Sequence, residues 1–352
     1  MNKKSNLPAD KTIKKILIIK WSAMGDIVIS TALFEDIRRA FPDAEIDLNI
    51  LPPWDHLFQD DPRFNEVIVV DLRKSEKGIK GFWRWIKEVR RRNYDLIVDL
   101  QTNDRSRWMM SALRLLGGRA RYRIGNHSGF PYNITRPSGT APLHSYDIQR
   151  AALEQAGIAQ AVLRPVLHIS EESRQKVAET MLEYGLQPLQ YAVFLPGSQA
   201  AGWLKRWGSE NYAALAELLR VKGVKKTIVI GGPDEIDECE RIAALVGQEW
   251  LINLCGKTRI DEIVPFAKSA RLLVGNDTGT AHVASCSDRP MVIVCGPTDP
   301  NRVKPVGENV VSLQAALDCI NCYCKKPCDH HSCMKRITPS MVLERLQKMD
   351  AL

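Results

Sequence analysis

Short aliphatic runs alternate with amphipathic stretches along the whole chain, and this alternation constrains the fold more than any other feature of the sequence. In the first half we expect strands at residues 15–20, 45–51, 67–70 and 95–99, and helices at residues 26–41, 81–92 and 105–116. Strands that alternate with helices predict a parallel sheet whose strands are joined by right-handed crossovers.

The same alternation begins again after residues 164–165. In the second half we expect strands at residues 191–195, 226–230, 251–253, 272–274 and 291–294, and helices at residues 211–221, 235–246 and 260–268. A chain of 352 residues also exceeds the usual size of a single hydrophobic core. We therefore predict an α/β fold with two Rossmann-like, doubly wound domains, residues 1–165 and 166–352, joined by a linker near residues 157–170 and facing each other across a cleft. A short helix at residues 339–348 closes the chain and either stays with the second domain or crosses back to the first.

Composition narrows the class of protein and its compartment. With 45% hydrophobic and 26% charged residues, the chain has the make-up of an ordinary globular protein. Its longest aliphatic runs, such as residues 16–19, are too short for a membrane span or a signal peptide. Nine cysteines in a chain of this length, without an export signal, are expected to be reduced thiols. We therefore expect a cytoplasmic protein.

The net charge of +8 lies entirely in the first half, where residues 1–168 contain 27 Lys and Arg against 19 Asp and Glu. Residues 73–92 alone hold nine basic and two acidic side chains. Such a field favours an anionic partner, although a solvated helix face is the competing interpretation. The expected helix at residues 81–92 also contains the apolar residues Phe82, Trp83, Trp85, Ile86 and Val89. We predict peripheral contact with an anionic membrane through this helix, with packing against the sheet as the alternative.

The first expected strand ends in a turn, residues 20–26, that leads into a helix. In an open α/β sheet this turn lies at the ligand-binding edge. The turn lacks the G-x-G-x-x-G spacing of a dinucleotide-binding loop, which argues against an NAD or FAD dehydrogenase. It offers instead the carboxylate of Asp26 near a helix N-terminus, where capping of the helix is the competing interpretation.

The second half contains two turns suited to an anion. Residues 195–198 (LPGS) follow a strand and precede Lys205, so backbone amides, Ser198 and the lysine together predict a diphosphate cradle. Residues 272–282 predict a buried strand, a tight turn at residues 278–280 and a helix whose N-terminus would bind an anion, with His282 within reach. Residues 256–258 (GKT) are not the end of a P-loop, because the motif requires glycine where Leu251 stands.

Five cysteines cluster near the C-terminus: Cys319, Cys322, Cys324, Cys328 and Cys333. His330 and His331 lie among them, so the cluster is dense enough to bind a metal. Its spacing, C-x2-C-x-C-x3-C-x4-C, matches none of the common zinc patterns. We therefore expect a reduced, metal-free cluster that packs the C-terminal tail.

Taken together, several motifs resemble those of the ADP-heptose:lipopolysaccharide heptosyltransferases of Gram-negative bacteria. The motifs are KILIIKWSAMGDIV at residues 15–28, LKRW at 204–207, GGPDE at 231–235, LCGKT at 254–258, GNDTGTAH at 275–282 and CMKRITP at 333–339. Their order and spacing cover nearly the whole chain. The resemblance implies a GT-B fold in which the N-terminal domain binds a lipid-linked acceptor and the C-terminal domain binds the nucleotide sugar.

The resemblance also implies roles for individual residues. Asp26 corresponds to the general base and Lys205 to the diphosphate-binding lysine. The positions that correspond to the family's nucleotide-sugar site are Ser198, Glu235 or its neighbour Asp234, Thr258, Asp277, Thr278, Gly279 and His282. Arg105, Arg121 and Arg123 are candidates for contact with the acceptor. The implied reaction is an inverting single displacement that needs no metal or cofactor, with ADP-heptose as a substrate.

Two other interpretations remain open at this point. One is a glycosyltransferase of the same fold that uses another nucleotide sugar, which the nucleotide that protects the protein against thermal unfolding would distinguish. The other is a basic nucleic-acid or interaction module with a cysteine metal site, which predicts bound zinc and salt-sensitive binding. Against the second, it assigns no role to two ordered α/β halves, and we expect no nucleic-acid partner.

Overall fold

The chain folds into two compact units, residues Met1–His168 and Ile169–Leu352. The computed structural model describes residues 5–72, 74, 77–137, 139, 144–198, 200–323 and 328–352. The division between the units falls inside the predicted linker at residues 157–170, three residues after the predicted domain boundary.

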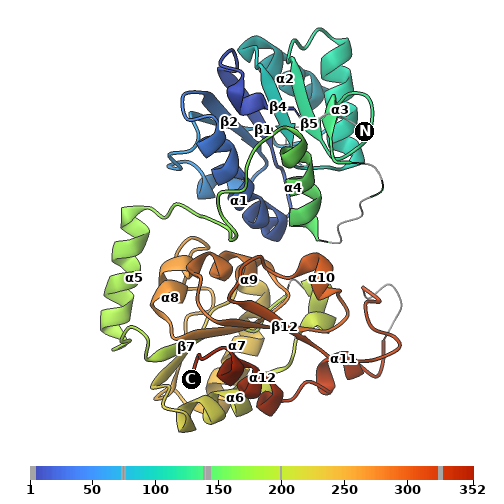
Figure 1. The fold of residues 1–352 in the computed structure, drawn as a ribbon. Helices are drawn as coiled ribbons and strands as arrows, with labels where there is room; N and C mark the ends of the chain where they lie inside the picture. The colour runs from blue at the N-terminus through green and yellow to red at the C-terminus, as the bar shows by residue number, and fades with distance from the viewer. Residues whose placement is uncertain are drawn as a thin grey trace. The chain divides into compact units, whose positions relative to one another are not determined.

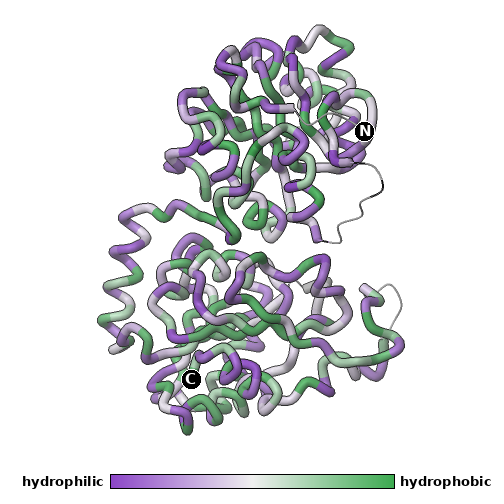
Figure 2. The backbone as a smooth tube through the Cα atoms, in the orientation of Figure 1, coloured by the Kyte–Doolittle hydropathy of each residue, from purple (hydrophilic) through white to green (hydrophobic). Residues whose placement is uncertain are grey.

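The first unit is a six-stranded sheet covered by helices. Its strands are β1 (Lys15–Ile19), β2 (Glu45–Ile50), β3 (Glu66–Val69), β4 (Leu96–Asp99), β5 (Tyr122–Gly125) and β6 (Ile134–Thr135). Its helices are α1 (Met24–Ala40), α2 (Ile79–Arg92), α3 (Asp104–Leu115) and α4 (Ser145–Gln155), with 3₁₀ turns η1 (Leu7–Ala9) and η2 (Trp54–Leu57). Helices α1 and α4 pack together over one face of the sheet, and α2 and α3 over the other (Figure 1). Because both faces are covered, the central strands are continuous hydrophobic runs (Figure 2).

The buried side chain of Asn49, on β2, fixes the start of the turn that follows β1. Its Oδ1 accepts hydrogen bonds from the indole Nε1 atoms of Trp21 and Trp85, each at 2.8 Å, and its Nδ2 donates to the Ile68 carbonyl at 2.9 Å. A fully buried amide with each of these groups paired is stable in the core. Trp21, near the start of the turn, is therefore tied to β2, β3 and α2.

The second unit has the same design. Its strands are β7 (Tyr191–Leu195), β8 (Lys226–Val229), β9 (Leu251–Asn253), β10 (Leu272–Asn276), β11 (Met291–Cys295) and β12 (Val310–Gln314). Its helices are α5 (Glu171–Glu183), α6 (Ser209–Val221), α7 (Ile236–Val246), α8 (Ile263–Ser269), α9 (Gly279–Ala284), α10 (Pro300–Val303), α11 (Ser332–Lys335) and α12 (Pro339–Lys348). Three 3₁₀ turns complete it: η3 (Ala200–Lys205), η4 (Pro233–Glu235) and η5 (Ser285–Ser287).

The two sheets share one strand order. The first runs β3-β2-β1-β4-β5-β6, the second runs β9-β8-β7-β10-β11-β12, and the paired strands are parallel. Numbered within each unit, both orders are 3-2-1-4-5-6, which confirms the prediction of two doubly wound Rossmann-like sheets. Ligands bind such sheets at the carboxyl ends of the strands where the order reverses. These positions are the ends of β1 and β4 in the first unit and of β7 and β10 in the second.

The C-terminal helix α12 belongs to the core of the second unit. Val342 and Leu346 are fully buried there, and α12 packs against α6 and β11. The apolar face of this helix, for which the sequence left both domains open, is therefore buried within the second unit.

Candidate active site

Asp26 stands at the reversal point of the first sheet, in the first turn of the helix that follows β1. The N-cap residue of α1 is Ala23, so Asp26 does not occupy the capping position that the competing interpretation assigns to it. Its partly buried carboxylate lies at the positive end of a 17-residue helix, where an anion is stabilised.

Helix α4 supplies the side chains that orient Asp26. Ser145 Oγ donates to Asp26 Oδ1 at 3.5 Å, and Gln149 Nε2 donates to Ser145 Oγ at 3.1 Å. The Ser30 hydroxyl lies 2.9 Å from Gln149 Oε1 and 2.8 Å from the Asp26 carbonyl oxygen. Among the described residues the carboxylate thus accepts one long hydrogen bond.

A buried lysine and aspartate lie beneath the same turn. Lys20 donates from Nζ to the Leu100 carbonyl at 3.0 Å, and burial lowers its pKa, an effect that Asp26 and Asp99 oppose electrostatically. Burial raises the pKa of Asp99, which accepts a hydrogen bond from the Tyr132 hydroxyl. The β1–α1 turn is therefore bonded to the end of β4 through Lys20 and the Leu100 carbonyl.

At the reversal point of the second sheet, Lys205 and Asp277 meet. Lys205 Nζ lies 2.9 Å from Asp277 Oδ2, and the same oxygen accepts a hydrogen bond from Thr298 Oγ1 at 2.9 Å. His282 Nε2 lies 4.0 Å from the other carboxylate oxygen, Oδ1. Asp277 is 6% exposed, whereas the Lys205 side chain is 31% exposed. The carboxylate is therefore a buried anchor that holds an accessible ammonium group.

The turn after β10 forms the N-terminus of α9. Thr278 is the N-cap residue, its Oγ1 accepts from the Ala281 amide at 3.3 Å, and its hydroxyl is 2.7 Å from that of Thr280. Gly279 opens the helix between them. Two hydroxyls and the amides of a helix start thus lie immediately after the anchor carboxylate, an arrangement that suits a phosphate group.

The turns after β7 and β8 pack against each other. Glu235 is buried, and a side chain at Gly197 would have its Cβ 2.0 Å from Glu235 Cγ, so only glycine fits there. Asp234, the alternative for the same predicted role, is exposed. Ser198 is buried beside this contact, and its Oγ donates to the Gly202 carbonyl at 2.7 Å.

Arg206 and the turn after β9 complete this side of the sheet. Arg206 Nη2 donates to the carbonyl oxygens of Ser198 and Asp234, at 2.9 and 2.7 Å, and so joins the β7 and β8 turns. Thr258 lies in the turn after β9, which is held to the β8 turn by the Gly256 amide and the Gly231 carbonyl at 3.0 Å.

A family model described as glycosyltransferase family 9 (heptosyltransferase) matches residues 82–332. The chain belongs to glycosyltransferase family 9. Lipopolysaccharide heptosyltransferase 2 from Salmonella typhimurium is 27% identical, and the alignment covers 95% of this chain and 98% of that one. A family 9 glycosyl transferase structure from Veillonella parvula has a TM-score of 0.81 at 22% identity, covering 96% and 97% of the two chains. E. coli ADP-heptose heptosyltransferase II has a TM-score of 0.73 at 24% identity, covering 95% and 98%.

Membership confirms that the protein is a glycosyltransferase with the GT-B type of fold. It also decides against an interaction module as the identity of the chain. Lys205 and Asp277 lie inside the matched residues, whereas Asp26 lies before them.

The three arginines proposed for the acceptor lie in different places in the family 9 protein. Arg105 lies in the first turn of α3, beyond the carboxyl end of β4, and its Nη2 donates to the Leu72 carbonyl at 2.6 Å. Arg121 lies just before β5, at the opposite edge of the sheet, and pairs with Asp10 Oδ2 at 3.2 Å. Arg123 donates from Nε to the Pro131 carbonyl at 2.6 Å, and burial lowers its pKa. Only Arg105 therefore lies at the edge where such sheets bind ligands.

Two residues that support the second turn are absent from the predicted site. Thr298 lies three residues after the end of β11, and the signal available in the sequence is a polar residue in the turn after a buried strand. Asn276 ends β10, where its fully buried amide receives a hydrogen bond from the Tyr212 hydroxyl at 3.0 Å and donates to the Pro196 carbonyl. No sequence pattern indicated that pairing, because it depends on β7 and β10 being neighbours.

The cysteine cluster is described in part, because Cys324 lies outside the described residues. Cys319 and Cys322 are exposed, Cys328 is partly buried and Cys333 is buried. In the described portion of the chain, no three His, Cys, Asp or Glu side chains are grouped so as to hold a metal ion.

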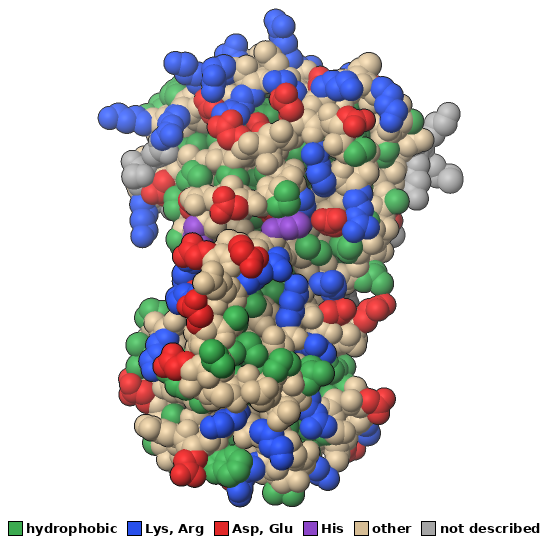
Figure 3. Space-filling model, turned by 90° about the vertical axis from the view of Figure 1, so that its left-hand side faces the viewer, with side chains coloured by type: hydrophobic (Ala, Val, Ile, Leu, Met, Phe, Trp, Pro, Cys, Tyr) green, Lys and Arg blue, Asp and Glu red, His purple; other side chains and the backbone are tan. Residues whose placement is uncertain are grey.

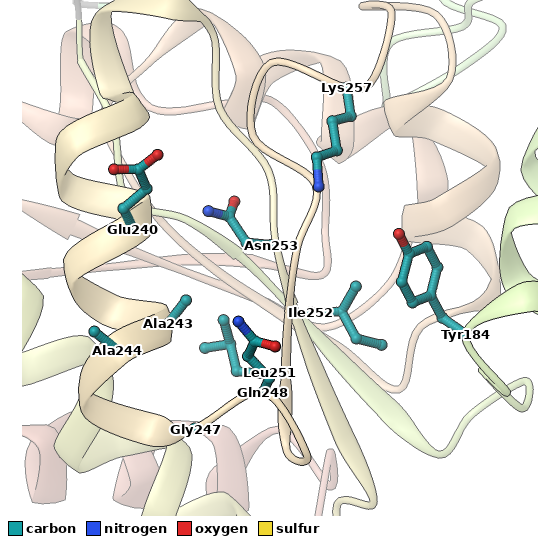
Figure 4. A pocket seen from close by; sticks show the side chains of 10 residues that line it. All are labelled: Tyr184, Glu240, Ala243, Ala244, Gly247, Gln248, Leu251, Ile252, Asn253 and Lys257. Carbon is teal, nitrogen blue, oxygen red and sulfur yellow. The ribbon is translucent and has the colours of Figure 1, made fainter.

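One cavity of about 650 Å³ lies away from Lys205 and Asp277, beside the edge strand β9 (Figure 4). Glu240 and Ala243 of α7 line it on one side of the strand and Tyr184 on the other. Lys257 also lines it, next to Thr258. The cavity therefore borders the β9 turn, while Lys205 and Asp277 lie at the centre of the sheet.

Proposed function

We propose that the protein transfers a heptose from ADP-heptose to the inner core of lipopolysaccharide. The donor and acceptor follow the names of its relatives, lipopolysaccharide heptosyltransferase 2 and the ADP-heptose enzyme of E. coli. The cluster of Lys205, Asp277 and the α9 N-terminus carries the proposal, because it joins an accessible ammonium group to a helix start at the reversal point of one sheet.

In the proposed reaction, Asp26 removes the proton of the acceptor hydroxyl as that oxygen attacks the anomeric carbon. The bond from that carbon to the diphosphate breaks in the same step, so the configuration inverts and one catalytic carboxylate suffices. Lys205, Ser198 and the amides of residues 278–280 stabilise the negative charge on the departing ADP. No metal or cofactor takes part.

The remaining residues position the two substrates. We assign the nucleotide sugar to the second unit, with Glu235 on the ribose, Thr258 on the adenine side and His282 near the phosphates. The acceptor belongs to the first unit, where Arg105 offers a cation to its phosphate or carboxylate groups.

Thermal unfolding in the presence of nucleotides tests the donor. A ligand that binds only the folded state raises the melting temperature, so ADP should do so at concentrations where UDP and GDP do not. Stabilisation by UDP or GDP instead of ADP would favour the alternative of another nucleotide sugar.

A transfer assay with defined acceptors tests the reaction. ADP-heptose is supplied with a Kdo-terminated or a heptose-terminated core oligosaccharide, and NMR of the product reports the anomeric configuration. We expect inverted product and unchanged turnover in EDTA. Retained configuration, or loss of turnover that a metal restores, would contradict the mechanism.

We also propose that the first unit contacts an anionic membrane. Within the described ranges, no helix has the length and apolar character needed to cross a bilayer. Trp85, Ile86 and Val89 are buried against the sheet, so for these the packing interpretation of α2 is the right one. Ile79, Trp83 and Trp108 remain 73%, 50% and 61% exposed. Phe82 lies between the two tryptophan rings, with centroid distances of 5.3 and 4.9 Å.

Basic side chains surround this apolar surface. Lys80 and Lys87 are exposed on α2, and Figure 3 shows Lys and Arg side chains gathered over one end of the first unit. Tryptophan with lysine or arginine is typical of surfaces that bind the bilayer interface. Arg92 does not belong to this surface, because it pairs with Glu66, Glu88 and Asp47.

Vesicle co-sedimentation tests this contact. Trp83→Ser with Trp108→Ser should reduce binding to vesicles that contain anionic phospholipid, and Lys80→Gln with Lys87→Gln should reduce its salt dependence. Leu182→Ser, at an 84% exposed residue of α5, is the matched control. Equal binding by the double tryptophan variant and the control would refute the contact.

A further inference from the structure

The loop that contains Lys205 is held by residues 328–337, the C-terminal segment that includes Cys328 and Cys333. His331 Nε2 lies 2.6 Å from the Leu204 carbonyl oxygen, and its ring lies 5.9 Å from that of Trp203. Trp207 Nε1 donates to the Ile337 carbonyl at 2.7 Å. The C-terminal segment therefore contacts residues on both sides of Lys205.

The C-terminal segment is itself anchored in the core of the second unit. Cys333, Met334 and Ile337 are buried there, among residues of α6, α12 and the central strands. A Cβ at Gly296, just after β11, would lie 2.5 Å from Met334 Sδ, so the backbone after β11 lies directly on the segment. The backbone that carries His331 is thus anchored by the buried residues that follow it.

The Lys205 loop needs such support. It is a short 3₁₀ turn, Ala200–Lys205, interrupted by non-helical backbone at Gly202. Short turns of this kind have little stability of their own. Among the described contacts, the carbonyl of Leu204, the residue before Lys205, is bound by the side chain of His331. These two residues are 127 positions apart in the sequence.

We propose that His331 is a positioning residue for Lys205. Because a carbonyl oxygen only accepts, His331 donates from Nε2, and this bond fixes the peptide between Leu204 and Lys205. The lysine is then directed at the site of the diphosphate without His331 touching the substrate. This inference rests on the proposed role of Lys205, and it gives the C-terminal segment a function that requires no metal.

The backbone of His331 guides the choice of variants. Its φ is 51°, in the left-handed region, where asparagine is among the best tolerated residues. His331→Asn therefore preserves the backbone but is too short to reach Leu204, whereas His331→Gln can place an amide donor near the former Nε2. His330→Asn is the matched control, because His330 Nδ1 bonds to Ser332 within its own segment.

Calorimetric titration with ADP and steady-state kinetics test the inference. His331→Asn should weaken ADP binding by about 3- to 10-fold, as expected for one lost hydrogen bond, while His331→Gln and His330→Asn stay within about 2-fold of the parent. The effect of His331→Asn should vanish in a Lys205→Ala background, because a positioning residue acts through the residue that it positions. A general loss of stability would be the same in both backgrounds.

The outcomes separate this inference from the proposed function. If Lys205→Ala weakens ADP binding but His331→Asn matches His330→Asn, the positioning role is wrong and the role of Lys205 stands. If His331→Asn weakens binding equally with and without Lys205, its role is structural and the inference fails. If Lys205→Ala leaves ADP affinity unchanged, the diphosphate assignment itself is wrong.

Discussion

The turn after β1 and the turn after β10 occupy related positions in their sheets, since each follows a strand at the point where the strand order reverses. Each contains an aspartate near the start of a helix, but the two carboxylates have different surroundings. Asp26 is partly buried and accepts one hydrogen bond of 3.5 Å from Ser145. Asp277 is buried and held by Lys205 and Thr298, and His282 Nε2 lies 4.0 Å from its other oxygen.

This difference separates two chemical roles. A general base must accept a proton, so its oxygens must be available to the substrate. A carboxylate oxygen that is already bonded to an ammonium group and a hydroxyl is occupied by these partners, which suits an anchor. On the proposed mechanism, one arrangement of strands provides the general base in the first unit and a charge-positioning carboxylate in the second.

The largest expected effect follows from replacing the carboxylate of the first unit. Asp26→Asn preserves size but cannot accept the acceptor's proton, so kcat should fall by about 10² to 10⁴. ADP affinity should stay near that of the parent, because the nucleotide is assigned to the second unit. Steady-state kinetics and calorimetric ADP titration measure the two quantities.

The same substitution at an exposed acid nearby provides the control for Asp26. Asp147, in the first turn of α4, is exposed, and Asp147→Asn should leave kcat unchanged. Near-normal turnover of Asp26→Asn would mean that the base lies elsewhere and that the contrast between the two turns has no catalytic meaning.

Removing the lysine of the second unit should affect both binding and rate. Lys205→Ala deletes a charged partner of the diphosphate in the bound donor and in the departing ADP, so ADP affinity and kcat should each fall by roughly 10- to 100-fold. Lys222→Ala, at an exposed residue after α6, is the control. If kcat alone falls, Lys205 acts only in the transition state and its charge does not hold the nucleotide.

Strand-forming aliphatic runs could be read from the sequence, and so could the polar residues that follow them. The sequence predicts both doubly wound sheets, and it singles out Asp26 and Lys205 near turns that follow strands, whereas Asp277 follows only from the family resemblance. The missed strands are less apolar or very short: β5 contains Arg123, β6 has two residues, and β12 is a partly exposed edge strand. Runs of this kind lack the burial on both faces that makes a strand recognisable.

The contacts that give the site residues their properties were not predictable from the sequence. Lys205 and Asp277 are 72 residues apart, and their pairing depends on β7 lying beside β10. The basic stretch at residues 73–92 predicts an anionic partner or a solvated helix face, yet the side chain of Arg92 is 16% exposed in a network with three carboxylates. A local charge pattern does not show which side chains long-range packing will pair.

The stability of the second unit should depend on pH because of the buried carboxyl of Glu238. Its side chain is 9% exposed, and burial raises its pKa to about 7, although Arg206 opposes this at 3.5 Å. The folded state therefore binds this proton more tightly than the unfolded state, so stability falls as pH rises from about 4.5 to about 7. Glu238→Gln should stabilise the protein by about 1 to 3 kcal/mol at pH 8 and very little at pH 5.

Chemical denaturation at both pH values measures this effect. Glu217→Gln, at a half-exposed residue of α6, should change stability little at either pH. Equal destabilisation by Glu238→Gln at pH 5 and pH 8 would show that the ion pair with Arg206 outweighs the burial of the carboxyl.

The smallest effects should come from deleting one hydroxyl at each turn, and they test the contrast between the turns directly. Thr298→Val removes a 2.9 Å hydrogen bond to Asp277. The carboxylate then holds Lys205 less firmly, so ADP affinity should fall by about 2- to 10-fold. Ser145→Ala removes the 3.5 Å bond to Asp26, which orients a base without contacting the nucleotide. The kcat of Ser145→Ala should fall by no more than about 3-fold, with ADP affinity unchanged, because so long a bond is weak.

Calorimetry and kinetics on the two variants should therefore give a binding change in Thr298→Val and a rate change in Ser145→Ala. A binding change in Ser145→Ala, or a pure rate change in Thr298→Val, would mean that the two aspartates do not divide the roles of base and anchor.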